Sequence, residues 1–214
     1  VLFRSATERL MSTLDIRRPS PHVAEVWLNR PEVRNAFNDG VIAELTHAFS
    51  QFGADPALRA IVLGGHGKAF CAGADLAWMR AMADYSWERN RADAQALADM
   101  LWTLYACPVP VVGRVHGDCY AGGVGLAAVC DVLVAAEGMQ FCLSEARLRL
   151  LPATIAPYVI RALGEQAIRE AHQAHRCGGI DTGLLTLEDE RAPRAGDEPA
   201  VRRRQVGDQR AVRV

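Results

Sequence analysis

The sequence lacks an excess of charge of either sign and any long apolar run. It has 214 residues, with 24 Lys and Arg against 25 Asp and Glu, so the formal net charge is −1 at pH 7. Nucleic-acid-binding proteins usually carry a basic excess, so we expect no nucleic-acid partner. No apolar run reaches the roughly 18 residues that span a bilayer, and the N-terminal stretch lacks the apolar centre of a secretory signal. We therefore expect a cytoplasmic protein with no membrane partner.

Paired cysteines and the common phosphate-binding and nucleophile motifs are also absent from the sequence. No C-x-x-C pair occurs, which disfavours zinc ribbons and thioredoxin-like motifs. We interpret the six cysteines, at 71, 107, 119, 130, 142 and 177, as buried thiols and predict no metal site. No G-x-x-x-x-G-K-[ST] occurs and no serine lies in G-x-S-x-G, which argues against P-loop proteins and α/β-hydrolases.

What the sequence does contain is an alternation of two patterns. Short apolar runs predict strands, and stretches whose apolar residues recur every three or four positions predict helices. Their alternation predicts an α/β fold with substantial parallel pairing. The predicted strands are 23–30, 58–63 (ended by Gly64-Gly65), 109–115, 131–136 and 141–143; the predicted helices begin at Asn38 or Asp39, or cover 75–84, 88–106 and 156–170.

Residues 171–214 differ from the rest of the chain in composition. They contain no Phe, Trp or Tyr and are dense in Arg, Gly, Asp, Glu and Pro. Segments this poor in large apolar groups do not easily offset the conformational entropy lost on ordering. We expect a poorly ordered tail, and a solvated helical hairpin is the alternative.

Two stretches of very small residues follow predicted strands and open predicted helices. The first is Ala72-Gly73-Ala74 before Asp75, and the second is CYAGGVGLAA at 119–128. Backbone N–H groups at a helix start have no intrahelical partner, and small side chains let a negatively charged oxygen approach them. Two such turns could hold one carbonyl oxygen between them as an oxyanion hole. The alternative is that both are tight turns that allow close helix–strand packing.

The second stretch also matches the G-x-G-x-x-A pattern of dinucleotide-binding folds at Gly123–Ala128. In those folds the first glycine directly follows the strand, whereas here several residues separate it from Val115. The predicted helix is also about half the usual length. These two differences disfavour a dinucleotide site.

A candidate acid or base is Glu145 in FCLSEARL, which follows a short apolar run. Apolar surroundings would partly desolvate this carboxyl group and raise its pKa. The alternative is that Ser144 and Glu145 only begin a helical turn.

Four motifs, taken in order, resemble the crotonase (enoyl-CoA hydratase/isomerase) superfamily: LNRPEVRNAF, GKAFCAGADL, HGDCYAGGVGLAAVCDVLVA and FCLSEARL. The resemblance covers about residues 14–168. It implies an α/β crotonase spiral of repeated ββα units, with a core domain at 14–170. Residues 1–13 are then expected to be an extension, foreign in part, and 171–214 an atypical C-terminal segment that a frameshift would explain.

The resemblance also implies roles for individual residues. The backbone N–H groups of Ala74 and Gly122 correspond to the donors that hold the thioester oxygen. Glu145 corresponds to the second of two catalytic glutamates, and the first falls on Gly125, so that carboxylate is absent. The residues expected to cradle coenzyme A, which is part of the substrate rather than a separate cofactor, are Val33, Arg34, Ala36, Ala72, Gly73, Asp75, Leu76 and Ala77.

The resemblance implies an enzyme that acts on an acyl-CoA thioester. We expect an enoyl-CoA hydratase that adds water across the 2,3 double bond. The segments DLAWM and FCLSEARLRLLPATIAPYVIRALGE resemble the bacterial branch that hydrates methylglutaconyl-CoA, a step of leucine degradation, or isohexenylglutaconyl-CoA. A double-bond isomerase with a single glutamate and a truncated, inactive CoA-binding module are the alternatives. The family implies a homotrimer or hexamer, which the atypical C-terminal segment puts in question.

Overall fold

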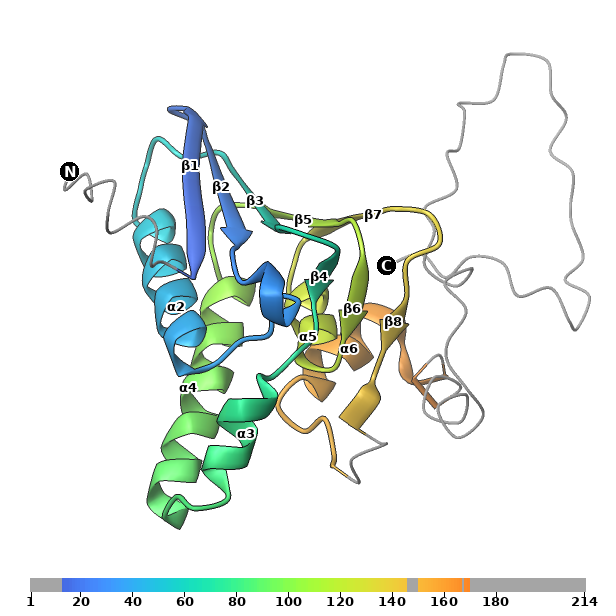
Figure 1. The fold of residues 1–214 in the computed structure, drawn as a ribbon. Helices are drawn as coiled ribbons and strands as arrows, with labels where there is room; N and C mark the ends of the chain where they lie inside the picture. The colour runs from blue at the N-terminus through green and yellow to red at the C-terminus, as the bar shows by residue number, and fades with distance from the viewer. Residues whose placement is uncertain (1–12, 146–149, 167, 170–214) are drawn as a thin grey trace, which may run out of the picture.

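The structure is a computed structural model that describes residues 13–145, 150–166, 168 and 169 (Figure 1). The expectations about the C-terminal segment 171–214, and about the N-terminal extension up to residue 12, lie outside the described residues. Among the described residues, no helix is long and apolar enough to cross a membrane.

A five-stranded sheet forms one layer of the molecule, in the order β1-β2-β3-β5-β7. All neighbouring pairs are parallel except β1 and β2, which are antiparallel. The predicted parallel pairing is therefore confirmed, whereas β1 was not predicted. The strands are β1 (Leu14–Ser20), β2 (Val23–Leu28), β3 (Ala60–Gly65), β5 (Val111–Val115) and β7 (Val132–Ala135).

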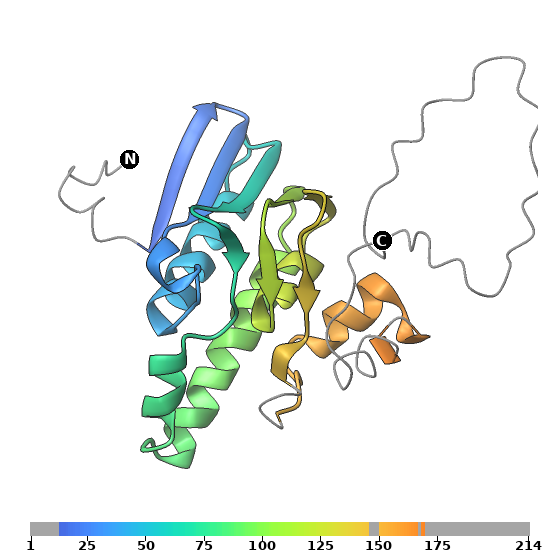
Figure 2. The same ribbon diagram turned by 45° about the vertical axis from the view of Figure 1, so that its right-hand side comes forward.

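A second, three-stranded sheet is wholly parallel and has the order β4-β6-β8. Its strands are β4 (Ala69–Cys71), β6 (Asp118–Tyr120) and β8 (Phe141–Cys142), which lie side by side in Figure 2. Each of them follows a strand of the large sheet and precedes a helix along the chain. These helices are α3 (Leu76–Met82), α5 (Gly122–Ala128) and α6 (Ala156–Leu163). This order is the expected spiral of ββα units.

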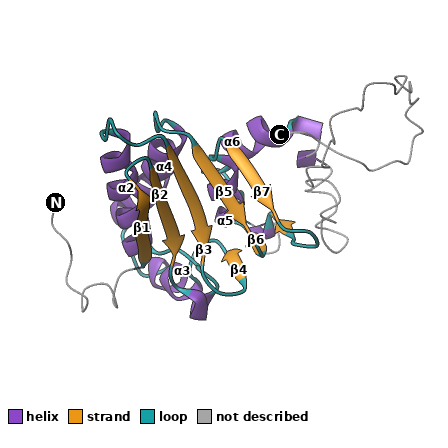
Figure 3. Cartoon of the chain, turned by 90° about the horizontal axis from the view of Figure 1, so that it is seen from above, coloured by secondary structure: helices purple, strands orange, loops and turns teal. Residues whose placement is uncertain are grey.

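Helices α2 (Asp39–Gly53) and α4 (Trp87–Tyr105) pack together and cover one face of the large sheet (Figure 3). Asn38 caps α2 by accepting the Val41 N–H at 3.1 Å, and Ser86 caps α4 in the same way. The predicted apolar stripe of α2 is buried in the core. Burying each such Leu or Phe side chain contributes about 1.5–3 kcal/mol.

Two predicted boundaries differ from those in the structure. Strand β3 continues through Gly64 and ends at Gly65, two residues later than predicted. A Cβ atom on Gly64 would lie 2.6 Å from the Trp27 ring, so the strand needs glycine there to pair closely. The helix predicted over 156–170 is interrupted, because α6 ends at Leu163 and Gly164 has a φ of +81°.

Candidate active site

The carboxyl ends of the three short strands lie at one edge of the small sheet. Strand β4 leads into the Ala72–Asp75 turn, β6 leads into Ala121 and Gly122, and β8 leads to Glu145. Because the strands are parallel and adjacent, these three segments converge at this edge. Ligands of parallel sheets characteristically bind outside the carboxyl ends of the strands. The structure thus brings the predicted segments into one region.

The first two turns are in direct contact at Gly73, which has a φ of +86°. A Cβ atom on Gly73 would lie 2.8 Å from Ala121 Cβ and 3.0 Å from both Gly122 N and Tyr120 O. Glycine is required here both for its backbone conformation and for this close approach. The alternative interpretation, tight turns with close packing, therefore describes part of what these residues do.

The second turn is joined to the third strand. The Ala121 N–H donates to Cys142 O at 2.7 Å, and Gly122 is the first residue of α5. A Cβ atom on Gly123 would lie 2.4 Å from Cys71 O, so α5 also presses against β4. These contacts fix the start of α5 relative to both neighbouring strands.

Two backbone N–H groups at this edge donate to no described residue. Ala74 forms an isolated parallel bridge with Phe37, in which Phe37 N donates to Gly73 O at 2.8 Å and Asp75 N donates to Phe37 O at 2.9 Å. This pattern turns the N–H of Ala74 away from Phe37. No described residue accepts a hydrogen bond from the N–H of Ala74 or of Gly122. Both predicted donors are thus unsatisfied within the part of the chain that the structure describes.

Asp75 anchors the first turn to the segment before α2. Its Oδ1 caps α3 by accepting the N–H of Ala77 at 2.8 Å, and its Oδ2 pairs with Arg30 Nη2 at 2.8 Å. Burial alone would raise the pKa of Asp75, but the ion pair with Arg30 and the N–H donors of α3 lower it below its usual value. Sequence reasoning placed Asp75 at the site but missed Arg30, although Arg30 lies inside the first family motif.

The expected CoA cradle is assembled from two segments that lie against each other. The Ala72 N–H donates to Arg34 O at 3.0 Å, and Ala36 O accepts from Arg30 Nη1 at 2.6 Å. Asn35, which sequence reasoning missed, is buried, and its side chain donates to His66 O at 2.7 Å. Of the predicted cradle residues, Val33, Arg34, Leu76 and Ala77 are exposed; Ala36, Gly73 and Asp75 are buried, and Ala72 is half-buried.

Backbone strain is concentrated in the same two regions. The described non-glycine residues with positive φ are Arg34 at 54°, Asn35 at 56° and Ala121 at 49°. Each such conformation costs on the order of 1–3 kcal/mol, and such residues cluster at functional sites. Their positions beside the two turns agree with a site at this edge.

Glu145 is half-buried, and its Oε2 is buried with no hydrogen-bond partner in the described structure. Burial raises the pKa of this carboxyl group, and a hydrogen bond from its own backbone N–H lowers it in part. The predicted desolvation is therefore present. A carboxyl group with a raised pKa, and with one oxygen that has no described hydrogen-bond partner, is a candidate for proton transfer.

Gly125 stands where a two-glutamate site would have its first glutamate, and apolar atoms fill the space beside it. A Cβ atom on Gly125 would lie 2.3 Å from Ile155 Cγ2. Ile155 directly precedes α6 and is only 3% exposed. The space beside Gly125 is therefore filled, and Glu145 has no second carboxylate from this position.

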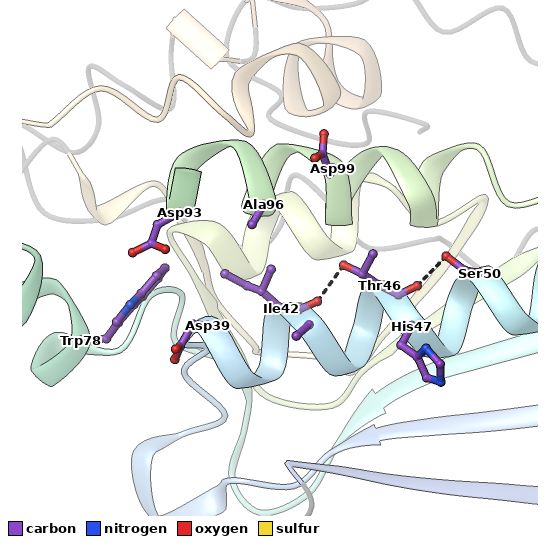
Figure 4. Close-up of a pocket in the computed structure, with 10 residues that line it drawn as sticks. Asp39, Ile42, Thr46, His47, Ser50, Trp78, Asp93, Ala96 and Asp99 are labelled. Atoms are coloured by element: carbon purple, nitrogen blue, oxygen red, sulfur yellow. Dashed lines mark hydrogen bonds between the residues drawn. The ribbon is translucent and has the colours of Figure 1, made fainter. Parts of the chain in front are cut away.

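A groove of about 480 Å³ lies elsewhere, between α2 and α4 (Figure 4). Its hydroxyl groups are satisfied within α2, because Thr46 Oγ1 donates to Ile42 O and Ser50 Oγ donates to Thr46 O. None of the predicted site residues is among its described lining. Its lining residues are Asp39, Ile42, Ala43, Thr46, His47, Ser50, Trp78, Asp93, Ala96 and Asp99.

The described cysteines are free thiols, and no group of three His, Cys, Asp or Glu residues within 13–145, 150–166 and 168–169 could hold a metal ion. Burial raises the pKa of the Cys71 thiol to about 12. That thiol therefore stays protonated and unreactive at neutral pH. Cys177 lies outside the described residues.

Comparison with known proteins gives consistent results. A family model described as enoyl-CoA hydratase/isomerase matches residues 19–179. An enoyl-CoA hydratase of Alternaria alternata is 39% identical over 164 residues, which are 75% of this chain and 53% of that protein. The mitochondrial Δ(3,5)-Δ(2,4)-dienoyl-CoA isomerase of Mus musculus is 33% identical over 149 residues, 64% of this chain and 45% of that one.

Among solved structures, an enoyl-CoA hydratase from Shewanella pealeana superposes with a TM-score of 0.74 at 36% identity. The match covers 80% of this chain and 66% of that one. The chain spans about half the length of the two curated relatives above.

Proposed function

Because the chain belongs to the enoyl-CoA hydratase/isomerase family, we propose that it hydrates the 2,3 double bond of an acyl-CoA thioester. One observation carries the proposal. The backbone N–H groups of Ala74 and Gly122 and a buried carboxyl oxygen of Glu145 have no hydrogen-bond partner among the described residues, and they come from the carboxyl ends of three adjacent parallel strands. Such a set can polarise a carbonyl and move a proton beside it.

The proposed reaction uses these groups in order. Water attacks Cβ, and the electrons of the double bond move so that negative charge develops on the thioester oxygen. The N–H groups of Ala74 and Gly122 stabilise that charge as the enolate forms. The enolate then takes a proton at Cα from the neutral carboxyl of Glu145, and the proton released by the attacking water restores the carboxyl.

Double-bond isomerisation is the second candidate, and the packing of Gly125 against Ile155 favours it. A two-carboxylate hydration needs a second acid, and this packing leaves no room for one at residue 125. Isomerisation needs only one group: ionised Glu145 would remove a proton at one carbon and return it two carbons away. The isomerase among the relatives also supports this candidate.

We further propose a branched substrate of the methylglutaconyl-CoA type, as the branch resemblance implies, which would place the enzyme in leucine degradation. We also propose a trimer or a dimer of trimers. A CoA-binding module without turnover remains the third candidate, because the chain spans only part of its relatives.

Incubation with 2-enoyl-CoA, 3-enoyl-CoA and methylglutaconyl-CoA tests these candidates. Hydration of a 2-enoyl-CoA adds the mass of one water to the product, whereas isomerisation gives a product of equal mass and different chromatographic retention. We expect hydration. If the protein binds CoA but forms no product, both enzymatic candidates are contradicted and the binding module is favoured.

A further inference from the structure

Phe37 contacts both turns of the candidate site. It lies between the segment 33–36 and helix α2 and is 1% exposed. Its backbone N–H donates to Gly73 O at 2.8 Å, and its backbone C=O accepts from Asp75 N at 2.9 Å. These two hydrogen bonds flank Ala74 and fix the direction of the Ala74 N–H.

The side chain of the same residue touches the second turn. A Cβ atom on Gly122 would lie 2.3 Å from Phe37 Cζ and 2.9 Å from Cε1. The tip of the ring therefore rests directly on the Gly122 backbone. An aromatic ring is rigid, so the distance from the Phe37 backbone to Gly122 is set by its length.

We propose that Phe37 is a positioning residue that sets the separation of the two N–H donors. This inference rests on the proposed function, in which Ala74 and Gly122 hold one thioester oxygen. The backbone of Phe37 fixes one donor and its ring fixes the other. Oxyanion donors must lie about 2.7–3.1 Å from the developing charge, and a misplacement of about 1 Å can cost about 10²-fold in rate.

Phe49 in α2 provides a matched control. It is also 1% exposed, and its ring packs edge-on against that of Phe52 at a centroid distance of 6.0 Å. Phe49 contributes to the same apolar core as Phe37. Replacing either phenylalanine by leucine removes a similar volume from a buried position, so a role limited to packing predicts similar effects of the two substitutions.

The test compares Phe37→Leu with Phe49→Leu by thermal unfolding, by CoA binding and by steady-state kinetics on the thioester that the wild-type chain turns over. We expect similar losses of Tm and unchanged CoA affinity. We expect kcat to fall about 10–100-fold in Phe37→Leu with KM nearly unchanged, because loss of a transition-state interaction lowers kcat. Phe49→Leu should retain kcat within about threefold, the range expected where no such interaction is lost.

A kcat for Phe37→Leu that matches Phe49→Leu would overturn the inference while leaving the proposed function intact. Absence of turnover by the wild-type chain would instead overturn the proposed function and this inference with it. The two failures are therefore distinguishable.

A second substitution, made in the wild-type and in the Phe37→Leu background, tests the contact itself. Gly122→Ala introduces a methyl group where the ring tip lies, so it should lower kcat in the wild-type background. Leucine at position 37 lacks Cζ, so Gly122→Ala should lower kcat less in the Phe37→Leu background. Contacting residues give such non-additive effects, and additive effects on kcat would contradict the proposal.

Discussion

Arg30 Nη2 lies 2.8 Å from Asp75 Oδ2, and the two side chains are only 19% and 12% exposed. This ion pair joins the segment before α2 to the first turn of the candidate site across 45 residues of sequence. The same guanidinium also binds Ala36 O. It therefore holds together the two halves of the expected CoA cradle.

We predict that the Arg30–Asp75 pair is coupled in stability and that acid weakens the coupling. The pKa of Asp75 is lowered in the folded state, so its contribution to stability is present above the unfolded pKa and is lost as pH falls through the folded one. A double-mutant cycle with Arg30→Met and Asp75→Asn should give a coupling of about 0.5–3 kcal/mol at pH 7 and less in acid. Denaturant unfolding measures it, and additive effects at pH 7 would contradict the prediction.

Replacement of Glu145 by glutamine should slow turnover about 10²–10⁴-fold while CoA binding persists, because a positioned acid or base contributes that much. Glu137→Gln is the control, since Glu137 is an exposed glutamate on the preceding loop.

The pH profile separates the two candidate reactions. The pKa of Glu145 is raised above its usual value of 4.5. Hydration needs the neutral carboxyl group, so kcat/KM should fall as pH rises through this pKa. Isomerisation needs the carboxylate, so kcat/KM should rise over the same pH range. A profile without this limb would remove Glu145 from either role.

Glu145 should also lower the stability of the folded chain at neutral pH. Its folded pKa is raised, so the neutral form is favoured by folding, and stability is lost as pH rises from the unfolded pKa through the folded one. The free energy of unfolding of Glu145→Gln should therefore exceed that of the wild type by more at pH 7 than at pH 4. Urea titrations at both pH values measure this difference, and an equal difference at both would show that the carboxyl is not desolvated.

Removal of the Ala74 N–H alone should slow the reaction without unfolding the turn. An amide-to-ester replacement at Ala74 deletes the donor, and loss of one oxyanion donor costs about 10²–10³-fold in kcat. The same replacement at Ala72 deletes a donor that binds Arg34 O within the same turn. The Ala72 ester should lower Tm with a smaller effect on kcat. Equal effects of the two esters on kcat would contradict a special role for Ala74.

Gly125→Ala should destabilise the protein even though alanine favours helices. The added methyl group would lie 2.3 Å from Ile155 Cγ2, and overpacking costs about 1–3 kcal/mol, more than the roughly 1 kcal/mol gained in helix propensity. Gly40→Ala in α2 is the control, because its nearest neighbour would lie 3.4 Å away. It should be neutral or stabilising. Adding Ile155→Ala to Gly125→Ala should reduce the loss of stability that Gly125→Ala causes alone. Thermal unfolding of Gly125→Ala, Gly40→Ala, Ile155→Ala and the double variant checks this.

The longer elements were predictable from the sequence because their apolar periodicity matches their burial. The stripe of α2, the caps at Asn38 and Asp75, and the strands of the large sheet other than β1 follow from local pattern. Strands β4 and β6 have three residues each and were not predicted, whereas the two-residue β8 was predicted from the apolar run at 141–143. The end of β3 was placed too early because Gly64 was read as a strand terminator. Its glycine is explained only by the close approach of the Trp27 ring from the neighbouring strand.

Some residues of the candidate site could likewise be predicted from local sequence and others could not. Ala74, Gly122 and Glu145 could be located from motifs, since small residues and an acid stand out locally. Arg30, Asn35 and Phe37 could not be assigned from pattern, because what they contact lies some 30 to 85 residues away in the chain. Partners at that separation become visible only when the strands are placed side by side.

Strand β8 has only two residues, and the Ala121 N–H donates to Cys142 O at its end. Phe141, Cys142 and Leu143 are nevertheless all buried, and core elements open at free energies up to that of the whole domain. The chain that leads to Glu145 is therefore expected to stay in place for as long as the domain is folded. The Ala121 amide should then exchange its hydrogen at the rate set by global unfolding, so this one amide reports how long the three segments stay assembled.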